Sequence, residues 1–142
     1  MLIELTPAAG ELEFSDHRLV GDWAAVLPAM LAQPQLPPWC LYTARSNGRV
    51  VGLGAFKSHP DKAGDVEISY LTLAAERSRG VANDVCAQLV LIALANDAST
   101  VIAHTLPQDN ASTEVLRRQG FALIGEVHDP EDGLVWRWSR ER

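Results

Sequence analysis

The residues best suited to chemistry lie in one short segment, Arg77-Ser78-Arg79-Gly80-Val81-Ala82. Gly80 and Ala82 are small enough to let a ligand approach the backbone, and the two arginines add positive charge. A helix that begins here would present unpaired backbone N–H groups and the positive end of its dipole. This combination is typical of a site for phosphate or pyrophosphate. The alternative is an ordinary helix start with two solvated arginines.

A second polar segment, residues 107–113, follows the next predicted strand and opens the next predicted helix. Its Asn110 and Ser112 are also good helix-capping residues, which is the alternative interpretation. Strand-to-helix turns of neighbouring parallel strands lie at one edge of a sheet, where α/β proteins bind ligands. Two such turns therefore predict a cofactor cleft. No P-loop pattern occurs, and the Gly-Leu-Gly at 52–54 opens no helix, so it is no dinucleotide fingerprint.

Three other side chains are candidates for acid–base chemistry. Glu67 lies in an otherwise apolar strand, as either a general base or an exposed carboxylate. Tyr70 is a weaker candidate, because strand alternation places it on the opposite face from Glu67. His104, near the end of the following strand, could shuttle protons or be a satisfied edge residue. The only cysteines, Cys40 and Cys86, lack metal-ligand spacing, so we predict no metal site and a reducing, cytoplasmic setting.

The apolar periodicity predicts the elements that must position these residues, in the order β-α-β-β-β-α-β-α-β-β. Asn47-Gly48 separates two segments of period two and predicts a tight hairpin. An antiparallel meander then leads into a β-α-β crossover, which requires a parallel strand pair. The fold class is α/β, with a mixed, mostly antiparallel sheet whose crossover carries the cofactor site. Strands are predicted at residues 2–6, 39–44, 50–56, 66–73, 100–106, 121–127 and 134–138, and helices near 15–30, 80–95 and 112–119.

Length and charge restrict the partners. The chain has 142 residues, 47% of them hydrophobic, which suits a single domain spanning 1–142. Its 12 Lys and Arg against 18 Asp and Glu give a formal net charge of −6. This balance argues against nucleic acid and anionic membranes as partners and leaves room for amines. No apolar run approaches the roughly 18 residues of a membrane span.

Four motifs together resemble the GCN5-related N-acetyltransferases (GNAT), most closely the branch of ribosomal-protein N-terminal acetyltransferases (RimJ/RimL-like). The resemblance runs from about residue 39 to 142. Two positions depart from it: glycine is usual at Ser69, and glycine or another small residue is common at Ser78, where serine should still fit. The motifs are Glu67-Ile68-Ser69-Tyr70, Arg77-x-x-Gly80-x-Ala82, Asn110-Ala111-Ser112 and Leu116-x-x-x-Gly120-Phe121.

The resemblance implies acetyl-CoA as co-substrate, with its pyrophosphate held by backbone amides of the turn at 78–82. It implies that backbone groups of Leu71 and Leu73 pair with the pantetheine arm like an added strand. It also implies that Asn110 bonds the cofactor near that arm and that the thioester lies where the parallel strands splay. The implied cofactor-binding residues are Leu71, Leu73, Ser78, Arg79, Gly80, Val81, Ala82 and Asn110.

Acetyl transfer to an amine requires a neutral amine, a stabilised carbonyl oxygen and a protonated leaving thiolate. We predict Glu67 as the base, directly or through water, and the resemblance implies Ser112 as the thiolate's proton donor. The predicted function is an acetyl-CoA-dependent N-acetyltransferase acting on a primary amine, either a protein N-terminus or a small molecule. The alternative is a non-catalytic acyl-CoA sensor or regulatory module of the same fold. Trp136 and Trp138 share a strand face, as core residues, as part of a homodimer surface or as part of an acceptor pocket.

Overall fold

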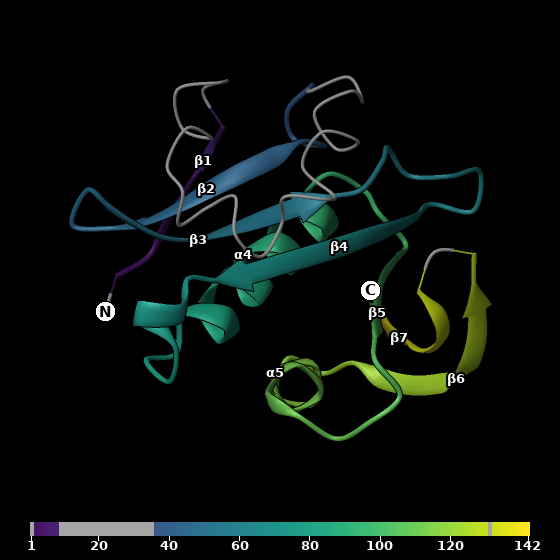
Figure 1. The fold of residues 1–142 in the computed structure, drawn as a ribbon. Coiled ribbons are helices and arrows are strands. Elements are labelled where there is room, and N and C mark those ends of the chain that lie inside the picture. The colour runs from purple at the N-terminus through teal and green to yellow at the C-terminus, as the bar shows by residue number, and fades with distance from the viewer. Residues whose placement is uncertain (1, 9–35, 131) are drawn as a thin grey trace.

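The computed structural model describes residues 2–8, 36–130 and 132–142. They form a seven-stranded mixed sheet in the order β1-β2-β3-β4-β5-β7-β6 (Figure 1). The predicted α/β class and element order are confirmed, except that the helix predicted near 15–30 lies outside the described residues. The elements are β1 (Glu4–Pro7), β2 (Leu41–Ser46), β3 (Arg49–Phe56), β4 (Asp65–Thr72), η1 (Ala74–Glu76), α4 (Val81–Ala95), β5 (Thr100–Thr105), α5 (Ala111–Arg118), β6 (Ala122–Asp129) and β7 (Gly133–Glu141).

The first four strands form the predicted antiparallel meander. The hairpin between β2 and β3 turns at Asn47 and Gly48, whose φ angles of 51° and 78° are those of a tight primed turn. Asn-Gly suits this turn because glycine adopts positive φ freely and asparagine tolerates it. The short-range pattern therefore set this part of the fold.

Helix α4 packs against the sheet through its apolar stripe, which includes the fully buried Val85 and Leu89. A Cβ added to Gly54 of β3 would lie 2.8 Å from Val85 Cγ1 and 3.2 Å from Leu89 Cδ1. The missing side chain therefore lets the helix sit close to the strand. Burying a Val or Leu side chain contributes roughly 1.5–3 kcal/mol, so this interface is a main source of stability.

The sheet divides between β4 and β5. Their parallel pairing covers only Asp65–Glu67 against Thr100–Ile102. Beyond that point β4 stays paired with β3, whereas β5 stays paired with β7. We call the resulting gap, between residues 68–72 of β4 and 103–105 of β5, the fork; Figure 1 shows the two strands diverging. The splay that the resemblance implied is therefore present.

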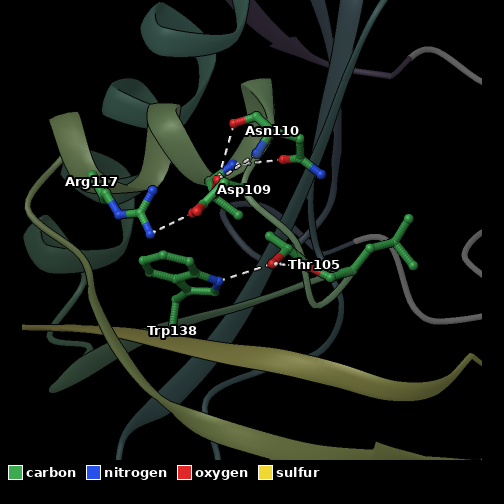
Figure 2. Close-up of polar contacts among 7 residues, drawn as sticks. Thr105, Asp109, Asn110, Arg117 and Trp138 are labelled. Atoms are coloured by element: carbon green, nitrogen blue, oxygen red, sulfur yellow. Dashed lines mark hydrogen bonds and ion pairs between the residues drawn. The ribbon is translucent and has the colours of Figure 1, made fainter.

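The two tryptophans of β7 lie on the face that packs against α5. Trp138 is 1% exposed, and its Nε1 donates to Thr105 Oγ1 over 3.0 Å (Figure 2). Trp136 is partly buried and contacts Trp138 edge to face, with ring centroids 6.3 Å apart. The core interpretation is confirmed for Trp138.

The cysteines have structural positions. Cys40 and Cys86 are free and buried, and burial raises the pKa of both thiols, that of Cys86 to about 12. Within the described ranges, no three metal-ligating side chains gather into a possible metal site. Neither helix found in this part of the chain is long and apolar enough to cross a membrane.

Candidate active site

A pocket of about 480 Å³ lies between the end of β4 and the N-termini of α4 and α5. Its volume falls in the range of small-molecule and cofactor sites. Of the residues predicted from the sequence, it gathers Leu71, Ser78, Gly80, Val81, Ala82 and Ser112. Glu67, Leu73, Arg79 and Asn110 are not among its lining residues. Its wall is completed by Tyr70, Thr72, Arg77, Asn83, Ala111, Glu114, Val115 and Arg118.

The N-terminus of α4 is open toward this pocket. Gly80 is its N-cap, and no side chain caps the helix. The first backbone bond of the helix runs from Asp84 N to Gly80 O over 3.1 Å. The N–H groups of residues 81–83 therefore have no partner within the helix, and they carry the positive end of its dipole. Such an end suits a phosphate group.

The turn before α4 contains two residues in the left-handed backbone conformation, which residues other than glycine rarely adopt. Gly80 has φ of 82° and Ser78 has φ of 67°, both in the left-handed region. A Cβ on Gly80 would meet no atom within 4 Å, so the conformation, not crowding within the chain, favours glycine. Alternating backbone of this kind turns successive N–H groups toward one anion.

The N-terminus of α5 is closed in comparison (Figure 2). Asn110 Oδ1 accepts from Thr113 N over 3.0 Å, and Thr113 Oγ1 accepts from Asn110 N over 2.9 Å. Arg117 also bonds Asp109 over 2.8 Å. The capping interpretation of Asn110 is therefore what the structure shows. Of the two predicted ligand-binding turns, that of α4 has no side-chain cap, whereas that of α5 has its third amide, Thr113 N, occupied by Asn110.

Two arginines give the pocket its positive charge, Arg77 from the turn and Arg118 from α5. Arg118 Nε also bonds Glu114 Oε1 over 3.1 Å. Sequence reasoning missed Arg118, because only the packing of α5 beside α4 brings it to the turn. Arg79 points elsewhere: its Nη1 lies 3.5 Å from Glu76 Oε2. Glu76 is buried and is also held by Arg49, at 3.0 and 3.1 Å.

The backbone of β4 corrects one expectation. Leu73 N donates to Val51 O over 3.0 Å, so this group is occupied by β3 and cannot pair with a cofactor arm. Lys57 N likewise donates to Glu67 O over 2.9 Å. Backbone groups alternate sides along an antiparallel ladder, so all odd-numbered residues from 67 to 73 face β3. Leu71 therefore faces β3 as well, opposite its register partner in that strand.

The groups that face the fork belong to the even-numbered residues of β4. Past the parallel pairing these are Ile68, Tyr70 and Thr72, and the last two line the pocket. The backbone groups of β4 that are open to an added strand in the fork are therefore those of Tyr70 and Thr72, and not those of the predicted Leu71 and Leu73. The alternation of residues in the sequence assigns side chains to the two faces of the sheet. It does not show which neighbouring strand a backbone group bonds.

The pocket wall near the fork holds three hydroxyl groups. Tyr70 Oη donates to Ser112 O over 3.4 Å, and burial raises the pKa of Tyr70, so it stays protonated. The Ser112 side chain lies beside it on the wall. Thr72 Oγ1 is the only buried side-chain nitrogen or oxygen of the described residues that lacks a hydrogen-bond partner. This buried hydroxyl has no partner among the described residues, and water or a ligand can supply one.

Glu67 lies on the opposite face of the sheet from Tyr70, as predicted. Its Oε2 is 3.0 Å from His104 Nδ1 and 3.1 Å from Lys57 Nζ. The side chains of Glu67 and His104 are 27% and 20% exposed, so both can be reached by a small molecule. Glu67 is thus a partly exposed carboxylate in contact with His104 and Lys57.

A family model described as "Acetyltransferase (GNAT) domain" matches residues 12–122, and the chain belongs to this family. The predicted GNAT resemblance is thereby confirmed. Acetyltransferase domains take their acetyl group from acetyl-CoA, and the open α4 N-terminus beside a cationic pocket fits that co-substrate. A comparison with curated proteins finds no match.

Solved structures show the same fold at low identity. An aminoglycoside acetyltransferase, AAC(6')-Ib, in complex with coenzyme A is 20% identical, with a TM-score of 0.79 and coverage of 99% of this chain and 95% of that one. A chimera of the spermidine N-acetyltransferase SpeG from Vibrio cholerae and hSSAT is 11% identical, with a TM-score of 0.81 and coverage of 99% of this chain and 96% of that one. The ribosomal L7/L12 α-N-protein acetyltransferase RimL is 16% identical, with a TM-score of 0.81 and coverage of 98% and 93%.

Proposed function

We propose that this protein is an acetyl-CoA-dependent N-acetyltransferase that moves an acetyl group directly to a primary amine, with residues 1–142 as its single catalytic domain. One observation carries the proposal: the pocket runs from the uncapped N-terminus of α4 to the unpaired edge of β4 in the fork. A polyanionic head can occupy the first end while an extended arm follows the second.

The chain supplies separate groups for each part of acetyl-CoA. The amides of residues 81–83 and the cations of Arg77 and Arg118 would hold the phosphates. The backbone edge at Tyr70 and Thr72 would hold the amide-rich arm as a strand partner. Bound acetyl-CoA supplies an activated thioester, which these contacts would bring to the fork.

Transfer forms a C–N bond to the amine while the C–S bond breaks. A backbone N–H of Tyr70 or Thr72 would stabilise the carbonyl oxygen as it gains charge. Ser112, on the pocket wall, would give a proton to the departing thiolate. Glu67, on the other face of the sheet, would promote loss of the amine proton.

The acceptor is proposed as a protein N-terminus or a small-molecule amine. The named acceptors of the similar structures, an aminoglycoside, spermidine and a ribosomal protein, all carry amines. The net charge of −6 suits an approaching cationic amine. Membership of the RimJ/RimL-like branch and a homodimeric state stay predictions.

The test is release of CoA thiol from acetyl-CoA over a panel of amines: peptides with different N-terminal residues, polyamines, amino acids and aminoglycosides. The proposal expects release that depends on one class of amine, with one acetylated product per thiol. A protein that gains thermal stability from acetyl-CoA but releases no thiol with any amine is the acyl-CoA sensor instead. Without either response, the proposed function is wrong.

A further inference from the structure

The contact between Glu67 and His104 favours one position for the proton on the imidazole ring. His104 Nδ1 lies 3.0 Å from Glu67 Oε2, and a lone pair on Nδ1 would face the negative charge of the ionised carboxylate. The contact therefore favours the hydrogen on Nδ1 and leaves the lone pair of neutral His104 on Nε2. In the described part of the chain, no residue is hydrogen-bonded to Nε2.

The pair stands at the base of the fork. Glu67 is the last residue of β4 that pairs with β5, and its register partner is Ile102. His104 lies two residues further along β5, on the part that has left β4. Its neighbour Thr105 bonds Trp138 on the α5 face, so alternation puts His104 on the face away from the cofactor pocket. A second substrate that approaches the fork from this face meets the imidazole.

One oxygen of Glu67 is already in contact with two nitrogen groups. Its Oε2 lies 3.0 Å from His104 Nδ1 and 3.1 Å from Lys57 Nζ. These two contacts crowd this oxygen against an incoming amine. In contrast, the lone pair of His104 Nε2 can accept a proton, as histidine does in general acid–base catalysis.

We infer that His104 is the catalytic base, accepting the acceptor's proton on Nε2, while Glu67 and Lys57 are positioning residues. This inference rests on the proposed function. A primary ammonium loses two protons on acetylation. The first passes to His104 Nε2 and then to solvent, which frees the nitrogen to attack. The second leaves to solvent after the C–N bond forms. The CoA thiolate receives one proton from Ser112 as the C–S bond breaks, and Ser112 regains a proton from solvent.

The first test needs no substrate. Nitrogen NMR of the histidine side chains, with the His104 signals assigned through His104→Gln, reports which ring nitrogen is protonated. We expect the Nδ1–H form for neutral His104, although free histidine side chains favour Nε2–H. Glu67→Leu should move His104 to the Nε2–H form. An Nε2–H form in the wild-type protein overturns the inference.

The second test uses the amine that the panel identifies as acceptor. We expect His104→Gln to lower kcat by about 10²- to 10⁴-fold while acetyl-CoA affinity stays unchanged. Free imidazole should restore part of the activity of His104→Ala, which a purely structural role would not allow. The matched control, His128→Gln on the exposed face of β6, should keep wild-type kinetics.

The two failures can be told apart. Full activity in His104→Gln overturns the role of His104 and leaves the proposed function standing. Lost activity in His104→Ala that imidazole does not restore, in a protein that still binds acetyl-CoA, also overturns the role. Absence of acetylation by the wild-type protein refutes the proposed function, and with it the inference.

Discussion

Replacing Thr72 by valine gives the most quantitative test of the pocket. Thr72 Oγ1 is buried without a partner, and an unsatisfied buried polar group costs about 1–3 kcal/mol. Valine has nearly the same shape and is equally at home in a strand. Without ligand, Thr72→Val should therefore raise the free energy of unfolding by about 1–3 kcal/mol. At roughly 2–4 °C per kcal/mol for a domain of this size, Tm should rise by several degrees.

Thr72→Val should also weaken the binding of acetyl-CoA. If acetyl-CoA bonds the Thr72 hydroxyl, the valine variant loses one hydrogen bond worth about 0.5–1.5 kcal/mol, or roughly a 2- to 13-fold increase in Kd. The assay is chemical unfolding with and without acetyl-CoA, with Kd measured by calorimetry. The expected pattern is higher stability of the free protein combined with weaker binding.

Thr105→Val is the matched control. Its hydroxyl accepts from Trp138 Nε1 over 3.0 Å, so the substitution leaves a buried indole N–H unpaired. We expect a loss of about 1–3 kcal/mol of stability. If Thr72→Val is destabilised like Thr105→Val, or if it binds acetyl-CoA as the wild type does, the reasoning about the Thr72 hydroxyl is refuted.

Three further predictions follow from the same geometry. Gly80→Ala and Gly48→Ala, at φ of 82° and 78°, should each cost about 1–2 kcal/mol of stability, but only Gly80→Ala should raise KM for acetyl-CoA; equal KM values would contradict an anion site at α4. Asn110→Ala should cost about 1 kcal/mol in denaturant unfolding with acetyl-CoA affinity unchanged, and weaker binding would restore the cofactor role implied for Asn110. Because burial raises their thiol pKa values, Cys40 and Cys86 should react with a disulfide reagent only after unfolding, and rapid labelling of the native protein would show that one is accessible.

Local patterns predicted the elements well, because the determinants lie within a few residues of each other. Asn47-Gly48 dictates its own turn, and the apolar stripe of α4 matches the buried residues. The backbone edge of β4 could not be predicted in this way. Alternation placed Leu71 and Leu73 on one face, but the pairing of Leu73 with Val51 decides that Thr72 faces the fork. That register depends on the neighbouring strand.

The residues of the site likewise fall into those that local patterns predict and those that depend on tertiary packing. The turn at 78–82 could be found because its small residues and its helix are contiguous. Arg118 comes from a different helix, and its place on the pocket wall follows from packing that no local pattern encodes. The pair of Glu67 and His104 depends on the parallel register of Glu67 with Ile102. Each residue was visible as a candidate, but their contact was not.

The central claim is that acetyl-CoA in this pocket loses its acetyl group to an amine at the fork. The most direct measurement quantifies CoA thiol and N-acetylated product together, with acetyl-CoA and each amine of the panel. The account predicts equal amounts of thiol and product, dependent on one class of primary amine and on the intact enzyme. Thiol release that is independent of every amine, or no release from a protein that binds acetyl-CoA, would contradict it.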